Sequence, residues 1–417
     1  MPAYITIFQY AVAAAGTVLF ALCLVFSVKS GIKYFKEPEE ALVCRESNLR
    51  IFARSLLYVL LLKLALAILG AVVTGKGFGM EAAYAWNRWD APHYIDIAKD
   101  GYVATGENSV FIAFFPLFPL LMKAMSFLTG EYFIAGSIVS MLCFAGALFY
   151  VYKLVFRDYG AKTARRSQIL MVLFPTAFFA TIAYTEGLFL LLTAAFMYYL
   201  RQRRLWAAAV LGFFAALTRS VGVMLVFPFG VQGLLDALHE GGGAREIIWR
   251  IMQRGWKVIL IPLGTVVYLL INYAVFGDAL HFLVAQREHW SQGMCFIGYT
   301  LRVLTNCVFT RDIRLVLELF LPELIAIFVV LWLLLGAARR KNSVMMAQAL
   351  PLYYMSVSVT WLLSAPRYMP VSYTHLDVYK RQEKKLLDGF SGEMEGDLRR
   401  YLKRLYANLS KPDKPRD

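Results

Sequence analysis

The chain has 417 residues, of which 59% are hydrophobic and 17% are charged. This composition, with a mean hydropathy of +0.57, excludes a soluble globular protein and indicates a polytopic membrane protein. The net charge of +15 could indicate nucleic-acid binding. An excess of Lys and Arg in a membrane protein more often marks cytoplasmic loops, so we expect no nucleic-acid partner.

Six apolar runs approach the roughly 20 residues that are needed to cross the hydrocarbon core of a bilayer. They cover residues 4–26, 55–73, 133–152, 258–276, 315–335 and 344–363. The first run lacks a basic leader and a small-residue cleavage site, so we interpret it as a retained helix. Shorter runs form two predicted hairpins, residues 168–183 with 186–200 and residues 205–218 with 220–236. The sequence therefore predicts about ten crossings.

Clusters of basic residues set the predicted orientation. They lie within residues 29–54, 153–166, 201–204, 245–257 and 339–341. If all of them are cytoplasmic, an even number of crossings must separate neighbouring clusters. Residues 111–128 would make that number odd, and they carry Pro116, Pro119 and Lys123, so we expect a kinked helix lying flat at the outer interface. The predicted fold is an all-α transmembrane bundle of about ten spans with one interfacial helix in the first outer loop.

The first outer loop contains a polar and aromatic segment, residues 86–102. Asp90, His93 and Asp96 follow one another at three-residue spacing, which places them near one another on a helix. Asp90 followed by Pro92 is typical of a helix N-cap. An aspartate at the mouth of a cavity could also act as a base. The three side chains could bind a divalent metal only with further ligands from elsewhere.

The even number of crossings between the basic clusters places further polar residues on the same outer face as Asp90. Glu186 and Arg219 lie at the tips of the two short hairpins, and residues 277–311 and 364–368 form the other outer segments. The hairpin arms have 14 to 17 residues, which is short for a straight crossing. Tips sunk into the membrane would place Glu186 and Arg219 below the headgroups, where an ionisable side chain usually faces a cavity or a partner.

Several short motifs follow one another between residues 80 and 370. They are the pairs Trp89-Asp90, His93-Tyr94, Ile97-Ala98 and Gly101-Tyr102, and then FFPLFPLL (114–121), YTEGLFLLL (184–192), AALTRSVG (215–222), GDALHFLVAQREHW (277–290) and SAPRYM (364–369). In these motifs the chain resembles the PIG-V type mannosyltransferases of the GT-C class of membrane glycosyltransferases. The resemblance implies transfer of a hexose, typically mannose, from a polyprenyl-phosphate sugar to an acceptor hydroxyl on the extracytoplasmic face, with inversion. It also implies a multi-pass protein of the cell membrane whose partners are membrane lipid, this donor and a glycan or glycolipid acceptor.

Asp90 is the predicted catalytic base, because an attacking hydroxyl must lose its proton to a group within hydrogen-bond reach. Arg219 and Arg367 are predicted to bind the leaving phosphate, although an arginine near a membrane surface can also anchor headgroups. Glu186 could orient Arg219, bind the sugar or be a solvated hairpin tip. The other candidate substrate-binding residues, which could instead only pack, are Trp89, His93, Gln286, Trp290 and Tyr368. No cofactor is expected, and a divalent metal at Asp90 and His93 is kept as an alternative.

Two other classes of function are compatible with polar groups in such a protein. A transporter or lipid flippase would place ionisable residues near the bilayer midplane and would show inverted repeats, and the sequence indicates neither feature. A metal-dependent hydrolase of lipid phosphates would use the same Asp90 and His93.

The sequence changes character after residue 370. Residues 371–382 resemble a translated sequencing-adapter peptide, and residues 383–417 are charged, with apolar residues at helical spacing, as in an unrelated or amphipathic helical tail. We therefore expect residues 1–370 to form the membrane-embedded transferase domain, truncated at its C-terminal end. A genuine cytosolic or periplasmic tail is the alternative.

Overall fold

The structure is a computed structural model that describes residues 3–34, 42–75, 79–339, 343–362 and 367. All of these residues lie in the first of the chain's two structural units, residues 1–375. The predictions for residues 371–382 and 383–417, and the one for Tyr368, fall outside the described residues.

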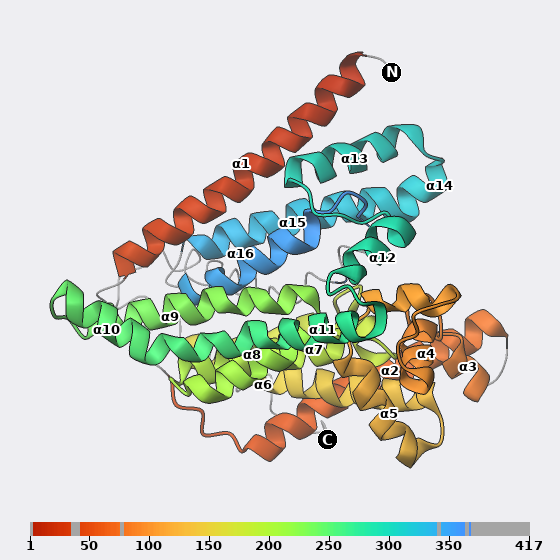
Figure 1. The fold of residues 1–417 in the computed structure, drawn as a ribbon, viewed down its shortest axis with the longest axis horizontal. Helices are drawn as coiled ribbons and strands as arrows, with labels where there is room; N and C mark the ends of the chain where they lie inside the picture. Colours follow the sequence, from red (N-terminus) through yellow and green to blue (C-terminus); the bar gives the residue numbers. More distant parts are fainter. Residues whose placement is uncertain (1–2, 35–41, 76–78, 340–342, 363–366, 368–417) are drawn as a thin grey trace, which may run out of the picture. The chain divides into compact units, whose positions relative to one another are not determined.

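Helices make up most of the described chain (Figure 1). In chain order they are α1 (Ala3–Tyr34), α2 (Asn48–Thr74), α3 (Met80–Tyr84), α4 (Ala91–Asp100), η1 (Glu107–Ala113), α5 (Leu117–Thr129), α6 (Tyr132–Val172), η2 (Ala177–Thr181), α7 (Glu186–Arg201), α8 (Leu205–Thr218), η3 (Ser220–Leu225), α9 (Val226–His239), α10 (Ala244–Gly255), η4 (Trp256–Ile259), α11 (Leu260–Phe276), α12 (His281–Trp290), α13 (Ile297–Thr310), α14 (Ile313–Leu315), η5 (Val316–Phe320), α15 (Leu321–Ala338) and α16 (Ser343–Val357). The β pairing seen in the described ranges is an isolated antiparallel bridge between Met294 and Val359. The predicted all-α class is therefore confirmed.

Six stretches of the described chain are long and apolar enough to cross a membrane. They are Tyr4–Ile32, Asn48–Thr74, Tyr132–Val172, Ser220–His239, Ala244–Phe276 and Ile313–Ala338. The chain is thus a multi-pass helical membrane protein. Other predicted crossings correspond to α7, α8 and α16, which have 16, 14 and 15 residues. Because these helices are shorter than the roughly 20 residues of a straight span, the number of ten crossings stays a prediction.

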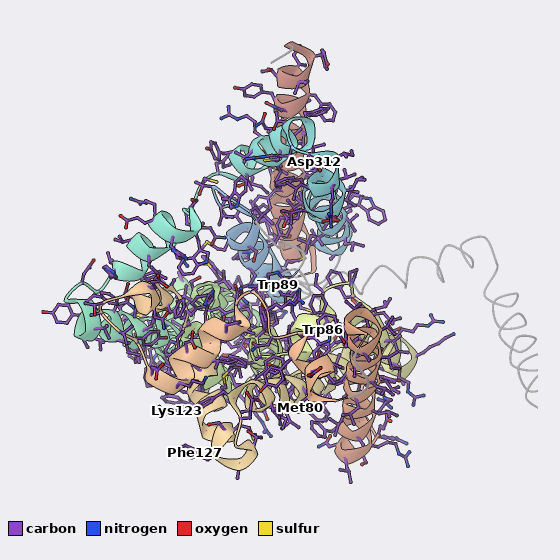
Figure 2. The ribbon with its side chains drawn as sticks, turned by 90° about the vertical axis from the view of Figure 1, so that its right-hand side faces the viewer. Met80, Trp86, Trp89, Lys123, Phe127 and Asp312 are labelled. Atoms are coloured by element: carbon purple, nitrogen blue, oxygen red, sulfur yellow. The ribbon has the colours of Figure 1, made fainter. Side chains whose placement is uncertain are left out.

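The proline-containing stretch within the predicted first outer loop is bent, as predicted. η1 and α5 meet at 111°, and Pro116 occupies the N-cap position of α5, where a missing N–H breaks no helical hydrogen bond. Phe127 and Leu128, near the end of α5, are each 83% exposed, and Figure 2 shows Phe127 toward this end of the helix. An exposed apolar tip is consistent with lipid contact. The flat interfacial position of the helix stays a prediction.

The predicted crossing over residues 168–183 is not one continuous helix. α6 turns back at Gly160, whose φ of 77° favours glycine, and Gln168 then donates a 3.1 Å hydrogen bond to a carbonyl of the first arm. The chain continues through the 3-10 helix η2 toward α7. Lys63 of α2 donates to the Thr181 carbonyl at 3.1 Å. This bond satisfies a backbone oxygen at a place where the regular helical pattern is interrupted.

The segment 277–311, predicted to be an outer loop, contains the helices α12 and α13. The 14 residues of α13 mix apolar and polar side chains, so no long apolar run marks this helix in the sequence. α13 packs against α1, which also contacts α15. Cys23, Leu301, Leu331 and Tyr353, from α1, α13, α15 and α16, belong to one buried core.

Candidate active site

Asp90 precedes α4, as the sequence predicts. It occupies the N-cap position, and Pro92 lies in the first turn. Within the described residues its carboxylate makes no capping hydrogen bond. Oδ2 of Asp90 instead accepts a hydrogen bond from Nη2 of Arg367 at 2.8 Å. Asp90 therefore has the position of a helix cap, but its side chain is used in an ion pair.

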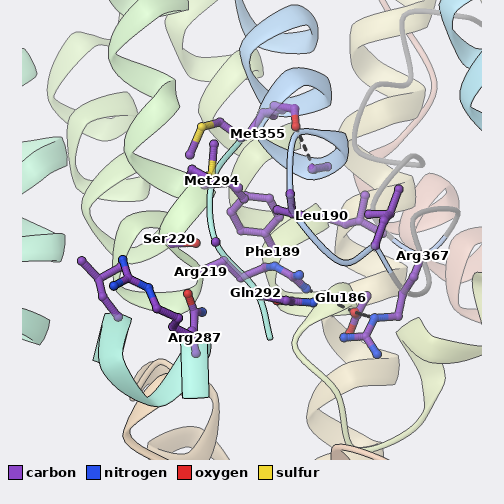
Figure 3. Close-up of a pocket in the computed structure, with 18 residues that line it drawn as sticks. Glu186, Phe189, Leu190, Arg219, Ser220, Arg287, Gln292, Met294, Met355 and Arg367 are labelled. Atoms are coloured by element: carbon purple, nitrogen blue, oxygen red, sulfur yellow. Dashed lines mark hydrogen bonds and ion pairs between the residues drawn. The ribbon is translucent and has the colours of Figure 1, made fainter. Parts of the chain in front are cut away.

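Glu186, the first residue of α7, connects two arginines (Figure 3). Its Oε1 lies 3.2 Å from Nη1 of Arg219 and 2.8 Å from Nε of Arg367. The Glu186 side chain is only 6% exposed, so its charge needs these cations nearby. Asp90, Arg367, Glu186 and Arg219 thus form a row of alternating charges, which we call the charged row.

Aromatic rings support both guanidinium groups of the charged row. The guanidinium of Arg367 lies over the rings of Phe179 and Tyr184, 5.2 Å from each centroid. That of Arg219 lies 5.9 Å from the centroid of Phe189. These are cation–π distances, and the contacts restrict the orientation of the cations.

A cavity of about 470 Å³ adjoins the charged row. Glu186, Arg219 and Arg367 line it, together with Gln286, another predicted site residue. The lining also includes the polar residues Ser220, Arg287 and Gln292 and the apolar residues Phe189, Leu190, Met294, Leu352, Val359 and Leu362. Figure 3 shows Met355 at a part of the cavity away from Arg367. The cavity therefore joins a charged region to an apolar one.

The predicted aromatic site residues pack among other rings. His93 and Trp290 both contact Phe114, with centroid distances of 5.5 and 5.6 Å. His93 also lies 4.4 Å from the ring of Phe111. Trp89 is 59% exposed, and its ring lies 5.9 Å from that of Phe179. Their contact with a substrate stays a prediction.

In the part of the chain that the structure describes, the acidic and histidine side chains of the site do not form a metal-binding group. Within the described residues, no group of three or more His, Cys, Asp or Glu side chains is placed to hold a metal ion. Asp90 and Asp96 do lie close enough to His93 to affect its pKa electrostatically. The donors among the described residues therefore do not fit a metal.

Burial lowers the pKa of His93 below its usual value near 6.5, although Asp90 and Asp96 act in the opposite direction. Between the lowered pKa and about 6.5 the unfolded chain binds more protons than the folded one. The stabilisation by neutral His93 is therefore complete above about pH 6.5 and is lost as the pH falls through the lowered pKa. We expect His93→Phe to lose less thermal stability than wild type between pH 7.5 and 5.5 in detergent. Equal losses would contradict this assignment.

Some residues of the site are not among the predicted ones. Tyr184 contacts the backbone of Asp90, and Thr185 accepts a 3.1 Å hydrogen bond from Arg219. Both lie in the YTEGLFLLL motif directly before Glu186, so this motif could have identified them as site residues. Nothing in the sequence marks Phe179, because it is one aromatic residue within an apolar run.

Residues 80–278 match the protein family described as Mannosyltransferase (PIG-V). Over this segment, which is slightly less than half of the chain, the protein is similar to the PIG-V mannosyltransferases. The match to the PIG-V family contains Asp90, Glu186 and Arg219 and ends before Gln286 and Arg367. The structure thus joins residues from within the matched segment to others beyond it.

Several known proteins are similar to different lengths of the chain. The GPI alpha-1,6-mannosyltransferase 2 of Rattus norvegicus is 32% identical over 154 residues, which are 34% of this chain and 30% of that protein. The corresponding protein of Homo sapiens is 30% identical over 151 residues, with the same coverage of 34% and 30%. GPI mannosyltransferase 2 of Schizosaccharomyces pombe is 25% identical over 325 residues, 68% of this chain and 67% of that protein. The chain thus spans 30% of the rat and human relatives. No solved structure matches.

Proposed function

We propose that the protein transfers mannose from a polyprenyl-phosphate donor to a hydroxyl of a glycolipid acceptor, with inversion. The observation that carries this proposal is the charged row, in which two carboxylates and two arginines alternate beside a cavity with an apolar region. The names of the relatives, GPI mannosyltransferases, support mannose as the sugar and a glycolipid as the acceptor.

The two regions of the cavity suit the two parts of such a donor. Arg219 and Arg367 offer planar, permanently charged donors to a phosphate. Leu352 and Met355 provide an apolar wall along which an isoprenoid chain could lie. A volume of about 470 Å³ is in the range of small-molecule sites. It can hold a sugar phosphate but only the first part of a long lipid chain.

In this proposal Glu186 binds a hydroxyl of the sugar. Oε1 is used by the two arginines, whereas Oε2 is buried and has no hydrogen-bond partner within the described residues. A buried carboxylate oxygen without a partner is costly, and a hydroxyl donor would satisfy it.

Asp90 completes the chemistry as the base. It accepts the proton of the acceptor hydroxyl while the hydroxyl oxygen forms a bond to the anomeric carbon. The bond from that carbon to the phosphate oxygen breaks, and its electron pair leaves with the phosphate. Arg219 and Arg367 stabilise this charge where it develops. A single displacement from the face opposite the leaving group inverts the anomeric carbon.

The proposed site faces the extracytoplasmic side of the cell membrane. This orientation follows from assigning the basic clusters of the sequence to the cytoplasm, which leaves the segments of Asp90, Glu186, Arg219 and Arg367 on the other side. Labelling single cysteines introduced in the loops with a membrane-impermeant reagent would test it.

The activity is tested with the full chain purified into lipid vesicles. We expect labelled mannose to pass from polyprenyl-phosphate mannose to a glycolipid acceptor and not from a nucleotide-linked mannose. Release of free mannose or phosphate that stops with a chelator would instead indicate a hydrolase. Movement of lipid across the vesicle membrane without sugar transfer would indicate a flippase. Either of these two results, without transfer, would contradict the proposal.

A further inference from the structure

The hydroxyl of Tyr184 forms hydrogen bonds with the backbone on both sides of Trp89. It accepts a hydrogen bond from the Asp90 N–H at 2.9 Å and donates one to the Arg88 carbonyl at 2.8 Å. Tyr184 is fully buried, at 0% exposure. Both hydrogen bonds of its hydroxyl thus go to the short loop that carries Asp90, which lies more than 90 residues earlier in the chain.

The loop needs such support because of its backbone. Trp89 has a φ of 56°, a left-handed conformation that is unfavourable for a residue with a large side chain. Strained conformations persist only where surrounding contacts hold them. The two hydrogen bonds of Tyr184 lie on either side of this residue, so they oppose relaxation of the loop to an ordinary conformation.

Tyr184 also supplies an acceptor at the start of this helix. The N–H of an N-cap residue has no partner within its own helix, and at Asp90 the Tyr184 hydroxyl accepts from it. Within the described ranges the Asp90 carboxylate makes no capping bond, and it is bonded to Arg367. The ring of Tyr184 lies under the guanidinium of the same Arg367. One side chain thus contacts both partners of this ion pair.

We propose that Tyr184 is a positioning residue, which sets the Asp90 carboxylate against Arg367 through its contacts with the loop backbone. This inference rests on the proposed function, because it concerns the geometry of the base in that reaction. The hydroxyl acts on Asp90, whereas the ring supports Arg367. The two parts of Tyr184 can therefore be separated by removing the hydroxyl alone.

Tyr184→Phe tests the inference in the vesicle assay with polyprenyl-phosphate mannose. We expect kcat to fall about 10- to 100-fold, because a small displacement of a reacting group has an effect of this size. The KM for the donor should change less than about twofold, because Arg219, Arg367 and the ring under Arg367 remain. Rates are normalised to the fraction of protein that binds polyprenyl phosphate, which corrects for any misfolded protein.

Tyr353→Phe is the matched control. Tyr353 is also a buried tyrosine whose hydroxyl donates to a backbone carbonyl, that of Ile327, at 3.1 Å. We expect its removal to leave the normalised kcat within about twofold of wild type, since the bond belongs to the core of α15 and α16. An equal loss in both variants would show a general effect of losing a buried hydroxyl and would overturn the inference.

A double-mutant cycle with Asp90→Glu shows whether Tyr184 acts through Asp90. Glutamate keeps a carboxylate but moves it by one methylene, so Tyr184→Phe should cost less than about threefold in this background. The same 10- to 100-fold loss in both backgrounds would overturn the inference, as would a Tyr184→Phe variant with wild-type kcat. Full activity of Asp90→Asn would be a different failure, because it would remove Asp90 from the proposed function itself.

Discussion

Asp90→Asn should lower the kcat of mannose transfer by about 10²- to 10⁴-fold, because an amide cannot take the proton of the acceptor hydroxyl. Asparagine has nearly the same shape and keeps an oxygen that can accept the 2.8 Å hydrogen bond from Arg367. The ion pair is replaced by a weaker hydrogen bond, and the site should keep its geometry. The rate is measured in vesicles with labelled polyprenyl-phosphate mannose, at equal amounts of protein.

Asp100→Asn is the control on the same helix. Asp100 is exposed at the end of α4, and its loss should leave the rate within about twofold of wild type. Binding of polyprenyl phosphate should be retained in both variants, because the arginines are unchanged. Transfer by Asp90→Asn at the rate of the Asp100→Asn control would remove Asp90 from the mechanism.

Arg367→Gln should reduce kcat/KM by about 10²- to 10³-fold, the usual effect of removing one preorganised donor to a developing charge. Arg367 contacts both Asp90 and Glu186 at 2.8 Å and lines the cavity. Its loss removes a phosphate partner and leaves two carboxylates with less compensation. Glu186 keeps its contact with Arg219, so the variant should still fold. Kinetics with a varied donor concentration and direct binding of polyprenyl phosphate provide the measurement.

Arg367→Lys separates the charge of this residue from its shape. Lysine keeps the positive charge but cannot reach two carboxylates with a planar fork, so only part of the activity should return. Arg302→Gln is the control, because Arg302 is a cation of α13 that lies over Tyr10 and Tyr299. A loss in Arg302→Gln as large as that in Arg367→Gln would point to lipid contact in place of phosphate binding.

The sequence predicts the helical elements best where local signals are strong. Residues 205–218 form α8 with the predicted bounds, and the helix after Asp90 begins as the proline in its first turn indicates. The bend before α5 follows from Pro116. In contrast, residues 168–183 have the composition of a span but contain an interruption. The backbone there is satisfied by Lys63 from α2, and local composition does not reveal such a partner.

In the candidate site, too, some features could be predicted from the sequence and others depend on tertiary contacts. The predicted orientation and the motifs group Asp90, Glu186, Arg219 and Arg367 on one face. The structure brings these side chains into contact in the charged row. His93 and Trp290 were predicted from the same motifs. Their rings both pack against Phe114, and their contact with a substrate stays a prediction. Position within a motif does not fix the direction of a side chain, because packing against distant rings decides it.

The sequence by itself determined the membrane class of the protein, its helical fold and the residue types available for chemistry. Composition and hydrophobic length are local properties, and they depend little on how the helices pack. Only the tertiary structure decided that the carboxylate of Asp90 is paired and not used as a cap. It also decided that Tyr184 holds the loop around Trp89. These features depend on contacts between residues more than 90 positions apart, which only the packing of the bundle brings together.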